Sequence, residues 1–269
     1  MIKNPIKTGT GISRREFAKM GVAATALAAG GLGTRALAQT PKRGGHLRFA
    51  LNGANSGASL DPATWGTGAL NNTGCWGAVY NSLTEIGPTG DLEGELAEHF
   101  EAKAGAAEWV FELRKGVEFQ NGKPLDSADV VASINHHRDE ASGSAASGIV
   151  AGIADIQADG PATVVFTLNE GNADFAYLMS DYHLPIGIAQ DDGKVNWQNP
   201  VGTGGYTIEH LEYGVRMDLK RQDNYWRNDR AFFDSVELLE IPDIAAVMNA
   251  HVTGEVDLVD AVDLKSLSL

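Results

Sequence analysis

Two groups of residues in this sequence could hold a metal ion, but their spacing argues against that chemistry. His136 and His137 are adjacent, and neighbouring positions on a helix point about 100 degrees apart, so the two rings cannot easily share one ion. Asp257, Asp260 and Asp263 lie near the end of a predicted strand, without the glycine-containing loop of a calcium site. We therefore expect no metal and no cofactor, and we interpret the three aspartates as a solvated acidic face.

Common hydrolase motifs are missing from the sequence, and residues 31–36 fit a loose dinucleotide-binding pattern only inside the export signal predicted at residues 1–38, without a strand before them. The sequence contains no Gly-x-Ser-x-Gly and no His-Glu-x-x-His. The stretch after Gly187 superficially resembles a phosphate-binding loop, but five residues separate Gly187 from Gly193 where four are needed, and Val195 replaces the hydroxyl. We predict that the protein is not an enzyme.

The N-terminal residues have the composition of an export signal. Arg14 and Arg15 precede a weakly apolar run at residues 20–34, and Ala36-Leu37-Ala38 provides a small-residue cleavage site. The run is shorter than the roughly 20 strongly apolar residues of a spanning helix. We predict a twin-arginine signal peptide at residues 1–38, cleaved after Ala38, and export to the periplasm by the twin-arginine machinery.

The charge and the cysteine content restrict what the exported chain could bind. The predicted signal holds six of the 21 basic residues and one of the 35 acidic ones, so a chain beginning after Ala38 has 15 basic and 34 acidic residues, a net charge of −19. An acidic surface repels nucleic acid and anionic lipid, so we expect neither as a partner. Cys75 is the single cysteine, which rules out an intrachain disulfide, and we expect it to be a small buried apolar residue.

Hydrophobic periodicity predicts a mixture of hairpins and strand-helix steps. Residues 108–113 alternate, with Trp109, Phe111 and Leu113 on one face, and Asp126 or Ser127 could cap a helix that ends near residue 138. Further strands are expected at 45–51, 82–86, 155–158, 163–168, 206–211, 215–220, 236–241 and 256–259, and further helices at 69–80, 173–180 and 244–252.

The second hairpin and the C-terminal elements give two specific expectations. The inner face of the hairpin should carry Val215, Met217 and Leu219. The helix at 244–252, between two strands, suggests a parallel βαβ step. The chain is therefore an α/β or α+β globular protein.

Ordered motifs along most of the chain resemble those of the extracytoplasmic solute-binding proteins of family 5, the peptide, dipeptide and nickel receptors of ABC importers. The motifs are GGHL at 44–47, LDP at 60–62, LAEHF at 96–100, WVFELRKGVEF at 109–119, GKPL at 122–125, SADVV at 127–131, GTGGY at 202–206, NYW at 224–226 and GEVD at 254–257. Most of them identify a scaffold of strands and turns rather than a ligand.

The resemblance implies the fold class and the domain organisation. We expect an α/β, periplasmic-binding-protein-like first lobe, a mixed sheet with flanking helices, carrying an extra α+β subdomain. The first lobe should occupy residues 39–82 and 201–269, and the extra subdomain residues 83–200. Members of this family are about twice as long, so we expect the second lobe to be absent and the chain to stop at the crossover toward it.

The resemblance also implies a function: the substrate-binding component of an ABC importer, which captures a small peptide-like solute in the periplasm and delivers it to the permease subunits. First-lobe ligand contacts in this family come from the loop after the first strand and from the extra subdomain, which makes Trp65, Thr67, Ser147, Tyr182 and His183 the candidate ligand-binding residues. Each also has a structural interpretation: Trp65 could fix its loop to the core, Ser147 could lie in a plain flexible loop, and Tyr182-His183 could cap a helix.

Two alternatives remain open at this point. The chain could be a fragment without independent function, since the charged groups that fix peptide termini in relatives lie largely in the other half. It could also be a receptor for a nickel chelate, haem, an opine or an oligosaccharide, because the motifs belong to the scaffold.

Overall fold

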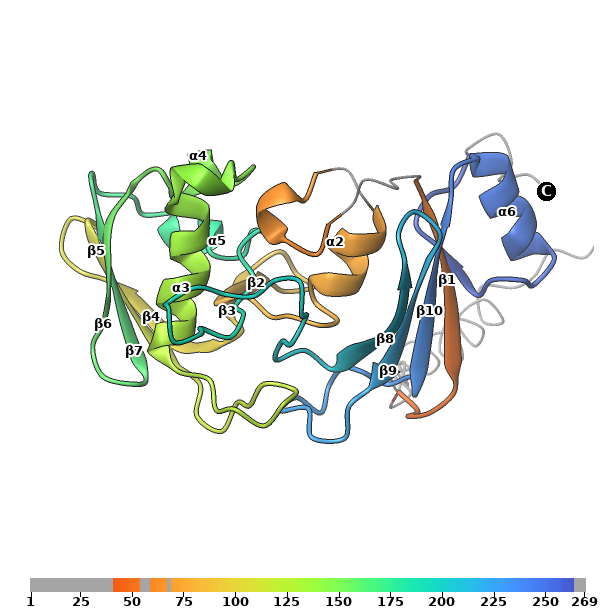
Figure 1. The fold of residues 1–269 in the computed structure, drawn as a ribbon, viewed down its shortest axis with the longest axis horizontal. Helices are drawn as coiled ribbons and strands as arrows, with labels where there is room; N and C mark the ends of the chain where they lie inside the picture. Colours follow the sequence, from red (N-terminus) through yellow and green to blue (C-terminus); the bar gives the residue numbers. More distant parts are fainter. Residues whose placement is uncertain (1–40, 54–58, 67–68, 264–269) are drawn as a thin grey trace, which may run out of the picture. The chain divides into compact units, whose positions relative to one another are not determined.

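The computed structural model of the chain describes residues 41–53, 59–66 and 69–263. The chain divides into two compact units, and the second, Arg43–Leu269, contains the elements described below (Figure 1). The predicted signal peptide lies outside the described residues. The described helices are α2 (Ala69–Cys75), α3 (Ser127–Arg138), α4 (Ser147–Val150), α5 (Phe175–Leu178), α6 (Ile244–Val252) and the short 3-10 turns η1 (Pro62–Thr64) and η2 (Glu140–Ser142).

A five-stranded mixed sheet has the strand order β11-β1-β10-β9-β8. Strand β1 is parallel to both β10 and β11, whereas β9 is antiparallel to β10 and to β8. The β8–β9 hairpin turns at Gly214, whose φ of 73° favours glycine. The strands are β1 (His46–Asn52), β8 (Tyr206–Glu212), β9 (Arg216–Arg221), β10 (Ser235–Ile241) and β11 (Leu258–Val259).

Adjacent residues of β1 point to opposite faces of this sheet, as the pleat requires. Leu51 packs in one buried cluster with Leu70 of α2, whereas Ala50 packs in another with Val247 of α6. The sheet is therefore flanked by α2 on one face and α6 on the other (Figure 1).

Helix α6 has the bounds that the sequence predicts, because both of its ends carry strong signals. Asp243 caps the N-terminus by accepting a hydrogen bond from the backbone N–H of Ala246 at 2.8 Å, and Gly254 follows the C-terminus with a φ of 76°. Strands β10 and β11 on either side of α6 are both parallel to β1, which lies between them. The predicted parallel βαβ step from β10 through α6 to β11 is confirmed, although β1 lies between its two strands.

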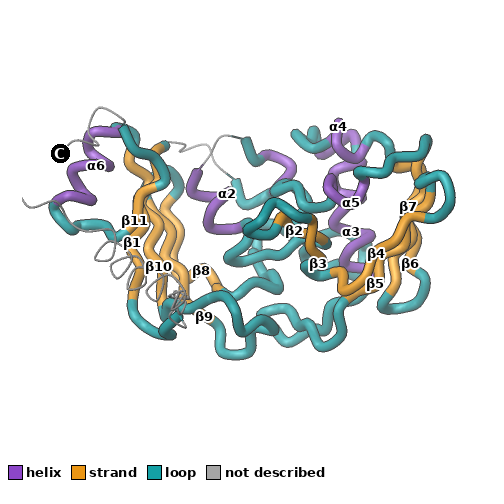
Figure 2. Tube along the Cα trace, turned by 180° about the vertical axis from the view of Figure 1, so that it is seen from behind, coloured by secondary structure: helices purple, strands orange, loops and turns teal. Residues whose placement is uncertain are grey.

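A second, antiparallel sheet has the order β4-β5-β7-β6 and is covered by α3 (Figure 2). As predicted, Trp109, Phe111 and Leu113 of β5 are buried and Glu108 and Glu112 are exposed. A two-stranded β2-β3 sheet precedes it. The strands are β2 (Thr84–Ile86), β3 (Leu92–Gly94), β4 (Ala97–Ala102), β5 (Glu108–Leu113), β6 (Ile153–Ala158) and β7 (Thr163–Leu168).

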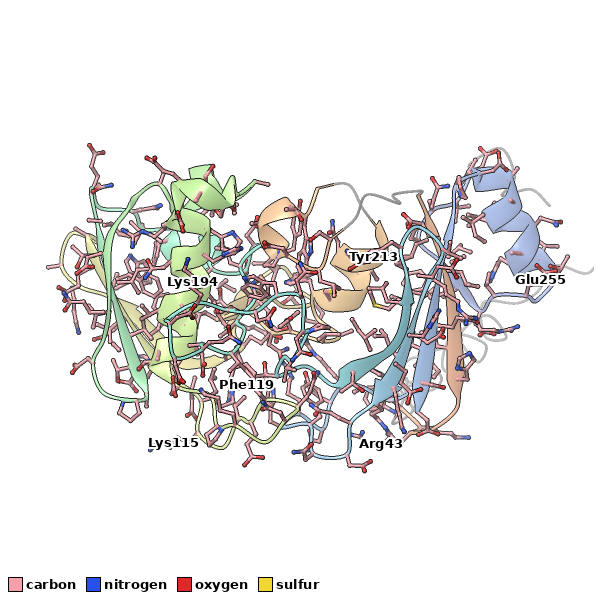
Figure 3. All side chains as sticks on the ribbon, viewed as in Figure 1. Arg43, Lys115, Phe119, Lys194, Tyr213 and Glu255 are labelled. Carbon is pink, nitrogen blue, oxygen red and sulfur yellow. The ribbon has the colours of Figure 1, made fainter. Side chains whose placement is uncertain are left out.

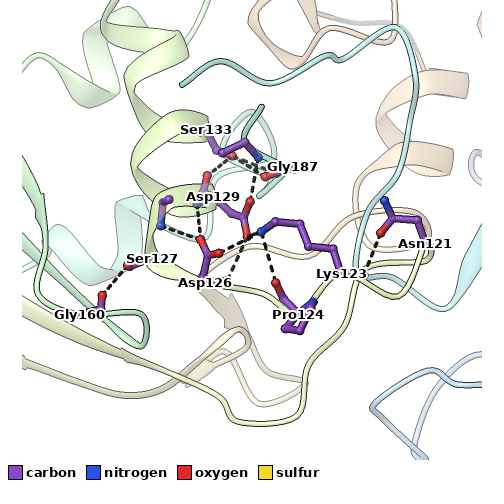
Figure 4. A network of polar contacts seen from close by, with 11 residues as sticks. Asn121, Lys123, Pro124, Asp126, Ser127, Asp129, Ser133, Gly160 and Gly187 are labelled. Atoms are coloured by element: carbon purple, nitrogen blue, oxygen red, sulfur yellow. Dashed lines mark hydrogen bonds and ion pairs between the residues drawn. The ribbon is translucent and has the colours of Figure 1, made fainter. Parts of the chain in front are cut away.

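Helix α3 begins where the sequence predicts, at a reciprocal capping box. Asp126 accepts hydrogen bonds from the backbone N–H groups of Ala128 at 2.9 Å and Asp129 at 3.2 Å, and the Asp129 carboxylate accepts one from the N–H of Asp126 at 3.0 Å. The ammonium of Lys123 binds both carboxylates, at 3.1 and 2.7 Å (Figure 4). These contacts fix the direction of α3, whose C-terminal end carries His136.

Three expectations are corrected by the structure. The helix predicted over 69–80 ends at Cys75, because the chain reverses at Gly77 with a φ of 80°. The helix predicted over 173–180 is a single turn, Phe175–Leu178. Val215 is 45% exposed because it belongs to the hairpin turn, whereas Met217 and Leu219 are buried as predicted.

Cys75 is fully buried within the same cluster as Leu51 and Leu70. Burial raises the pKa of its thiol to about 12. The prediction of a small buried apolar residue is confirmed, because a thiol held protonated in the core has little nucleophilic character.

Candidate functional site

The loop between β1 and α2 contains a described segment, residues 59–66, that folds into a compact turn. The indole N–H of Trp65 donates to the carbonyl of Ser59 at 3.0 Å, and the Asn71 side chain donates to the same carbonyl. The Asn72 side chain donates to the carbonyl of Gly66 at 2.7 Å. The segment is therefore held both to itself and to α2.

Three contacts also fix segment 59–66 to residues of the 83–200 region. His136 of α3 lies with Nε2 2.7 Å from a carboxylate oxygen of Asp61. The backbone N–H of Ala145 donates to the carbonyl of Ala63 at 2.8 Å. Nε2 of His183 lies 2.6 Å from the carbonyl oxygen of Trp65. Residues more than 70 positions apart in sequence thus meet at one turn of the loop.

Asp61 is the charged centre of this segment. Its carboxylate accepts a hydrogen bond from the backbone N–H of Ala63 at 2.9 Å and so caps η1, with Pro62 in the first position. Burial on its own raises the pKa of Asp61, but the hydrogen bonds from His136 and from Ala63 outweigh it and leave the pKa below its usual value. Asp61 is therefore an anion that the surrounding donors stabilise.

Trp65 is only 2% exposed, and its indole ring lies in the buried cluster that contains Leu60 and Leu70. This placement fits the structural interpretation, in which the ring fixes the loop to the core. A ligand contact by Trp65 stays a prediction. Thr67 lies outside the described residues.

His183 is also buried, with 7% of its surface exposed. Its Nδ1 lies 2.7 Å from a carboxylate oxygen of Asp181, and its ring lies against that of Tyr182, with 3.8 Å between ring centroids and 34° between the ring planes. The structure thus brings three predicted site residues together, since His183 contacts both Trp65 and Tyr182. A direct ligand contact by His183 stays a prediction.

Tyr182 faces a hollow of about 360 Å³ that it lines together with Asn72, Thr73 and Trp76. Burial and the nearby charge of Asp181 raise the pKa of its phenol, which stays protonated as a hydrogen-bond donor. Trp76 is 42% exposed, so two aromatic rings with polar tips border this hollow. Aromatic walls with a few polar groups are typical of small-molecule sites.

Ser147 lies at the first position of α4, where its side chain is exposed at a hollow of about 850 Å³ between α3 and α4. The same hollow is lined by Ser144, whose hydroxyl lies 2.7 Å from Nδ1 of His137. Burial lowers the pKa of His137 to about 3, so this ring is neutral. Ser147 borders a different hollow from Tyr182, and a ligand contact by Ser147 stays a prediction.

A third hollow, of about 680 Å³, was not predicted from the sequence. It lies between α3 and the loop at 192–198, and Asp61, His136, Lys194 and Trp197 are among its lining residues. Lys194, labelled in Figure 3, lines this hollow together with Ala132 and Asn135 of α3. Trp197 is 3% exposed, and within the described residues its indole N–H has no hydrogen-bond acceptor. The sequence feature that could have indicated this hollow is the Leu60-Asp61-Pro62 motif, because its aspartate caps η1 and lines the hollow.

The residues that could have bound a metal have other partners. The rings of His136 and His137 lie edge to face, 5.3 Å apart, and contact Asp61 and Ser144 respectively. Among residues 41–53, 59–66 and 69–263, no three His, Cys, Asp or Glu side chains are grouped as metal ligands.

Asp257 and Asp260 of the C-terminal aspartates are exposed, as expected for a solvated face, but each also has a hydrogen-bond partner. The Asp257 carboxylate binds the guanidinium of Arg48 at 2.9 and 3.1 Å, and Asp260 accepts a hydrogen bond from the backbone N–H of Asn52 at 2.9 Å. Both side chains fasten β11 to β1, which the local sequence does not indicate. Within the described part of the chain, no helix has the length and apolar character needed to cross a bilayer.

The five-stranded mixed sheet with its flanking helices, followed by a second antiparallel sheet, is the fold of a solute-binding protein. Residues 91–269 match the family of bacterial extracellular solute-binding proteins, family 5 Middle. This match covers more than half of the chain, and the chain therefore belongs to that family. The mixed α/β fold that the resemblance implied is confirmed.

Solved structures of binding proteins share this fold over most of the chain. The periplasmic binding protein DppA from Helicobacter pylori, associated with an ABC transporter and solved with the peptide STSA, is 26% identical with a TM-score of 0.74, over 85% of this chain and 49% of that one. AgaA from Agrobacterium tumefaciens R10, in complex with agropinic acid, is 26% identical with a TM-score of 0.74, over 83% and 45%. A nickel ABC transporter protein from Bacillus halodurans is 27% identical with a TM-score of 0.70, over 83% and 44%.

Among curated proteins, the HTH-type transcriptional regulator SgrR of Photorhabdus laumondii is 28% identical over 170 residues, which are 62% of this chain and 29% of the relative. The uncharacterized protein YhjP of Bacillus subtilis is 30% identical over 137 residues, 51% of this chain and 22% of the relative. The chain thus spans about half the length of the solved relatives and less than a third of these curated ones.

Proposed function

We propose that this protein is the substrate-binding component of an ABC importer, which captures a small peptide-like solute in the periplasm and delivers it to the permease. Membership of the solute-binding family supports the class. The observation that carries the proposal is that segment 59–66 is fixed at three points to the 83–200 region. Asp61 of this segment lines one hollow, and Tyr182, the neighbour of the His183 that contacts Trp65, lines another. A rigid loop beside aromatic and polar walls can bind a solute without making or breaking a bond.

The proposed organisation is a first lobe at 39–82 and 201–269 with an extra subdomain at 83–200. The buried residues support it, because one cluster contains Leu83, Phe111 and Ile186 and another contains Leu51, Met217 and Leu238. In this organisation the ligand is enclosed by hinge closure against a second lobe. The permease then recognises the closed form.

The ligand class is tested by thermal shift on the protein expressed from its complete gene. A ligand at 100 times its dissociation constant stabilises the folded state by about 2.7 kcal/mol, which raises the melting midpoint by roughly 5–10 °C. The panel contains the tetrapeptide Ser-Thr-Ser-Ala, mixed dipeptides, agropinic acid, a nickel–histidine complex, haem and oligosaccharides. We expect a peptide to give the largest shift. A shift with another class alone overturns the peptide assignment, and no shift with any of them contradicts the proposed capture of these solutes.

Tyr182 and a matched tyrosine test the site. Tyr182→Ala should abolish most of the ligand-induced shift, because the ring borders the hollow that Asn72, Thr73 and Trp76 also line. Tyr177→Ala removes an equally large ring that is 48% exposed on α5 and should leave the shift unchanged. Equal behaviour of the two variants would place the ligand elsewhere.

The proposed route of export is the twin-arginine machinery. Replacing both Arg14 and Arg15 by lysine should retain the protein in the cytoplasm, whereas Lys3→Arg should be exported like the parent protein. Cell fractionation measures the outcome. Periplasmic recovery of the double variant would argue for a different route.

A further inference from the structure

We propose that the hollow of about 680 Å³ lined by Asp61 and Trp197 binds a small cationic amino acid, a molecule with two ammonium groups and one carboxylate. This hollow is separate from the one at Tyr182, since the two share no lining residue. Binding in the hollow is measured on its own, whereas a role of that binding in import rests on the proposed function.

Two parts of the chain form the walls of this hollow, and backbone contacts hold both in place. One is the C-terminal half of α3 with its capping residue Asp139. The other is the loop at 192–198, which begins in a tight turn. There the backbone N–H of Gln190 donates to the carbonyl of Lys194, and the N–H of Gly193 donates to the carbonyl of Gln190, both at 2.8 Å. The positions of both walls are therefore set by the chain itself.

Three carboxylates line the hollow, and each has one oxygen without a partner. The Oδ1 atoms of Asp61, Asp139 and Asp192 accept hydrogen bonds from the backbone N–H groups two residues further along, at 2.9, 2.9 and 3.0 Å. Oδ1 of Asp61 also lies 2.7 Å from Nε2 of His136. Among the described residues, no hydrogen bond or ion pair occupies the three Oδ2 atoms. An ammonium group suits such oxygens, because a charge-assisted hydrogen bond is roughly twice as strong as a neutral one.

Two donors at the same hollow lack acceptors in the part of the chain that the structure describes. The ammonium of Lys194 forms no ion pair there. Trp197 is only 3% exposed, and its indole N–H has no hydrogen-bond acceptor. A buried N–H without an acceptor is destabilising, so an oxygen atom of a ligand at this position would stabilise the folded protein.

The orientation of the Trp197 ring leaves its N–H on the side of the hollow. A Cβ built at Gly187 would lie 3.0 and 3.1 Å from Cζ3 and Cη2 of the indole. These two atoms belong to the benzene edge, opposite Nε1, and Gly187 does not line the hollow. The ring of His136, which does line it, lies 5.7 Å from the indole between ring centroids. The N–H edge is therefore the one that faces the hollow.

The balance of charges and hydrogen-bonding groups selects the class of ligand. Three aspartates and one lysine give the walls an excess of negative charge, which favours a cation. Two ammonium groups on the ligand supply donors for the aspartates, and a carboxylate supplies acceptors for Lys194 and for the N–H of Trp197. A bare metal ion fits less well, because no three His, Cys, Asp or Glu side chains of residues 41–53, 59–66 and 69–263 are grouped as its ligands.

Isothermal titration calorimetry on the protein expressed from its complete gene tests this site with three matched compounds. L-Ornithine carries all three charged groups, L-norvaline lacks the side-chain ammonium, and putrescine lacks the carboxylate. We expect L-ornithine to bind and each of the other two to bind roughly tenfold more weakly, because each loses a charge-assisted contact. No binding of L-ornithine, or equally tight binding of either comparison compound, would overturn the proposal.

Matched variants place the ligand in the hollow. Asp192→Asn removes one charge but keeps the oxygen that accepts from the N–H of Lys194, and it should weaken L-ornithine binding roughly tenfold. Asp191→Asn makes the same change at the preceding exposed residue, which does not line the hollow, and should bind like the parent. Trp197→Phe keeps a buried ring without the N–H and should also bind more weakly. Equal affinities of the two asparagine variants would show that L-ornithine binds elsewhere.

Proton–nitrogen NMR of the parent protein follows the indole N–H of Trp197 directly and serves if Trp197→Phe does not fold. Its signal should move when L-ornithine saturates the protein. A signal that stays in place while L-ornithine binds would overturn the assignment of the N–H to the ligand. L-Ornithine binding and the peptide-induced thermal shift are separate readouts, so failure of this site and failure of the proposed function are distinguishable.

Discussion

The ammonium of Lys123 lies 2.7 Å from a carboxylate oxygen of Asp129, whose side chain is completely buried in the first turn of α3. The same carboxylate accepts hydrogen bonds from the backbone N–H groups of Asp126 at 3.0 Å and Ala189 at 2.8 Å. A buried charge with this many donors is stable only while all of them remain. The pair therefore fixes α3, and with it His136, to the loop at Ala189.

Asp129→Asn should reduce the free energy of unfolding by about 3–5 kcal/mol, because the amide NH₂ cannot accept the hydrogen bonds that the Lys123 ammonium and the Asp126 backbone N–H donate to one carboxylate oxygen, and Lys123 keeps only Asp126 as a carboxylate partner. Asp126→Asn makes the same chemical change at the N-cap, where asparagine also caps well, and should cost less than about 1 kcal/mol. Urea denaturation measures both. Equal losses would mean that the buried pair contributes no more than the cap.

Gly204→Ala should be destabilising because a Cβ at this position would lie 2.2 Å from the carbonyl oxygen of Ala78, a backbone atom that cannot move aside cheaply. We expect a loss of about 1–3 kcal/mol or more. Gly148→Ala in α4 meets nothing within 4 Å and should be neutral or stabilising by up to about 1 kcal/mol. Melting midpoints compare the two, and a Gly204→Ala midpoint equal to the parent's would contradict the close contact.

Elements with strong local signals could be predicted from the sequence. Strand β5 alternates apolar and charged residues with period two, and α6 has a capping aspartate and a terminal glycine, so the predicted bounds of both agree with the structure. Strand β4 was missed because it lies at the edge of its sheet and carries mostly exposed polar residues, with Ala97 as its one buried side chain. Pairing with β5, rather than its own pattern, makes it a strand.

The site was less predictable because its contacts join distant parts of the chain. The bond from His183 to the carbonyl of Trp65 spans 118 positions and that from His136 to Asp61 spans 75. The family resemblance marked Trp65 and His183 as candidate ligand-binding residues but could not say that they touch. The partner of a polar side chain is decided by how the two regions pack together, and hydrophobic periodicity in the sequence does not reveal this.

Glu95 should make the protein less stable as the pH rises from about 4.5 to about 7. Burial raises the pKa of this carboxyl to about 7, although hydrogen bonds from the backbone N–H of Ser82 at 2.7 Å and the Asn81 side chain at 2.6 Å favour the charged form. A raised pKa means that the folded state binds the proton more tightly than the unfolded chain, so stability is lost over this window by about 3 kcal/mol.

Glu95→Gln should remove that part of the pH dependence, because its side chain does not ionise. Glu93→Gln, two residues earlier at an exposed position of β3, should keep the full slope. Urea denaturation at several pH values from 4.5 to 8 measures the difference. If Glu95→Gln follows the parent curve, another group causes the slope.

The ion pair between Arg48 and Asp257 should hold β11, the shortest strand of the five-stranded sheet, in place. Strand β11 has two residues, so its ladder with β1 is brief, but the Asp257 carboxylate accepts hydrogen bonds from the Arg48 backbone N–H, Nε and Nη2 at 2.9, 3.1 and 2.9 Å. The side-chain bonds from Arg48 and then its backbone N–H lower the pKa of Asp257 to about 2. A lowered pKa stabilises the strand at neutral pH, and this contribution is lost as the pH falls toward 2.

Arg48→Gln should therefore move the titration midpoint of Asp257 upward from about 2 toward its usual 3.8, as followed by carboxyl NMR. Asp257→Asn should increase hydrogen exchange at the Asp260 amide, which donates to the carbonyl of Ala50 at 3.2 Å. Asp260→Asn is the matched control, because an amide oxygen can still accept from the N–H of Asn52 and the strand should stay protected. Similar exchange in both variants would show that the ladder alone holds β11, since only Asp257→Asn removes a charge paired with a guanidinium.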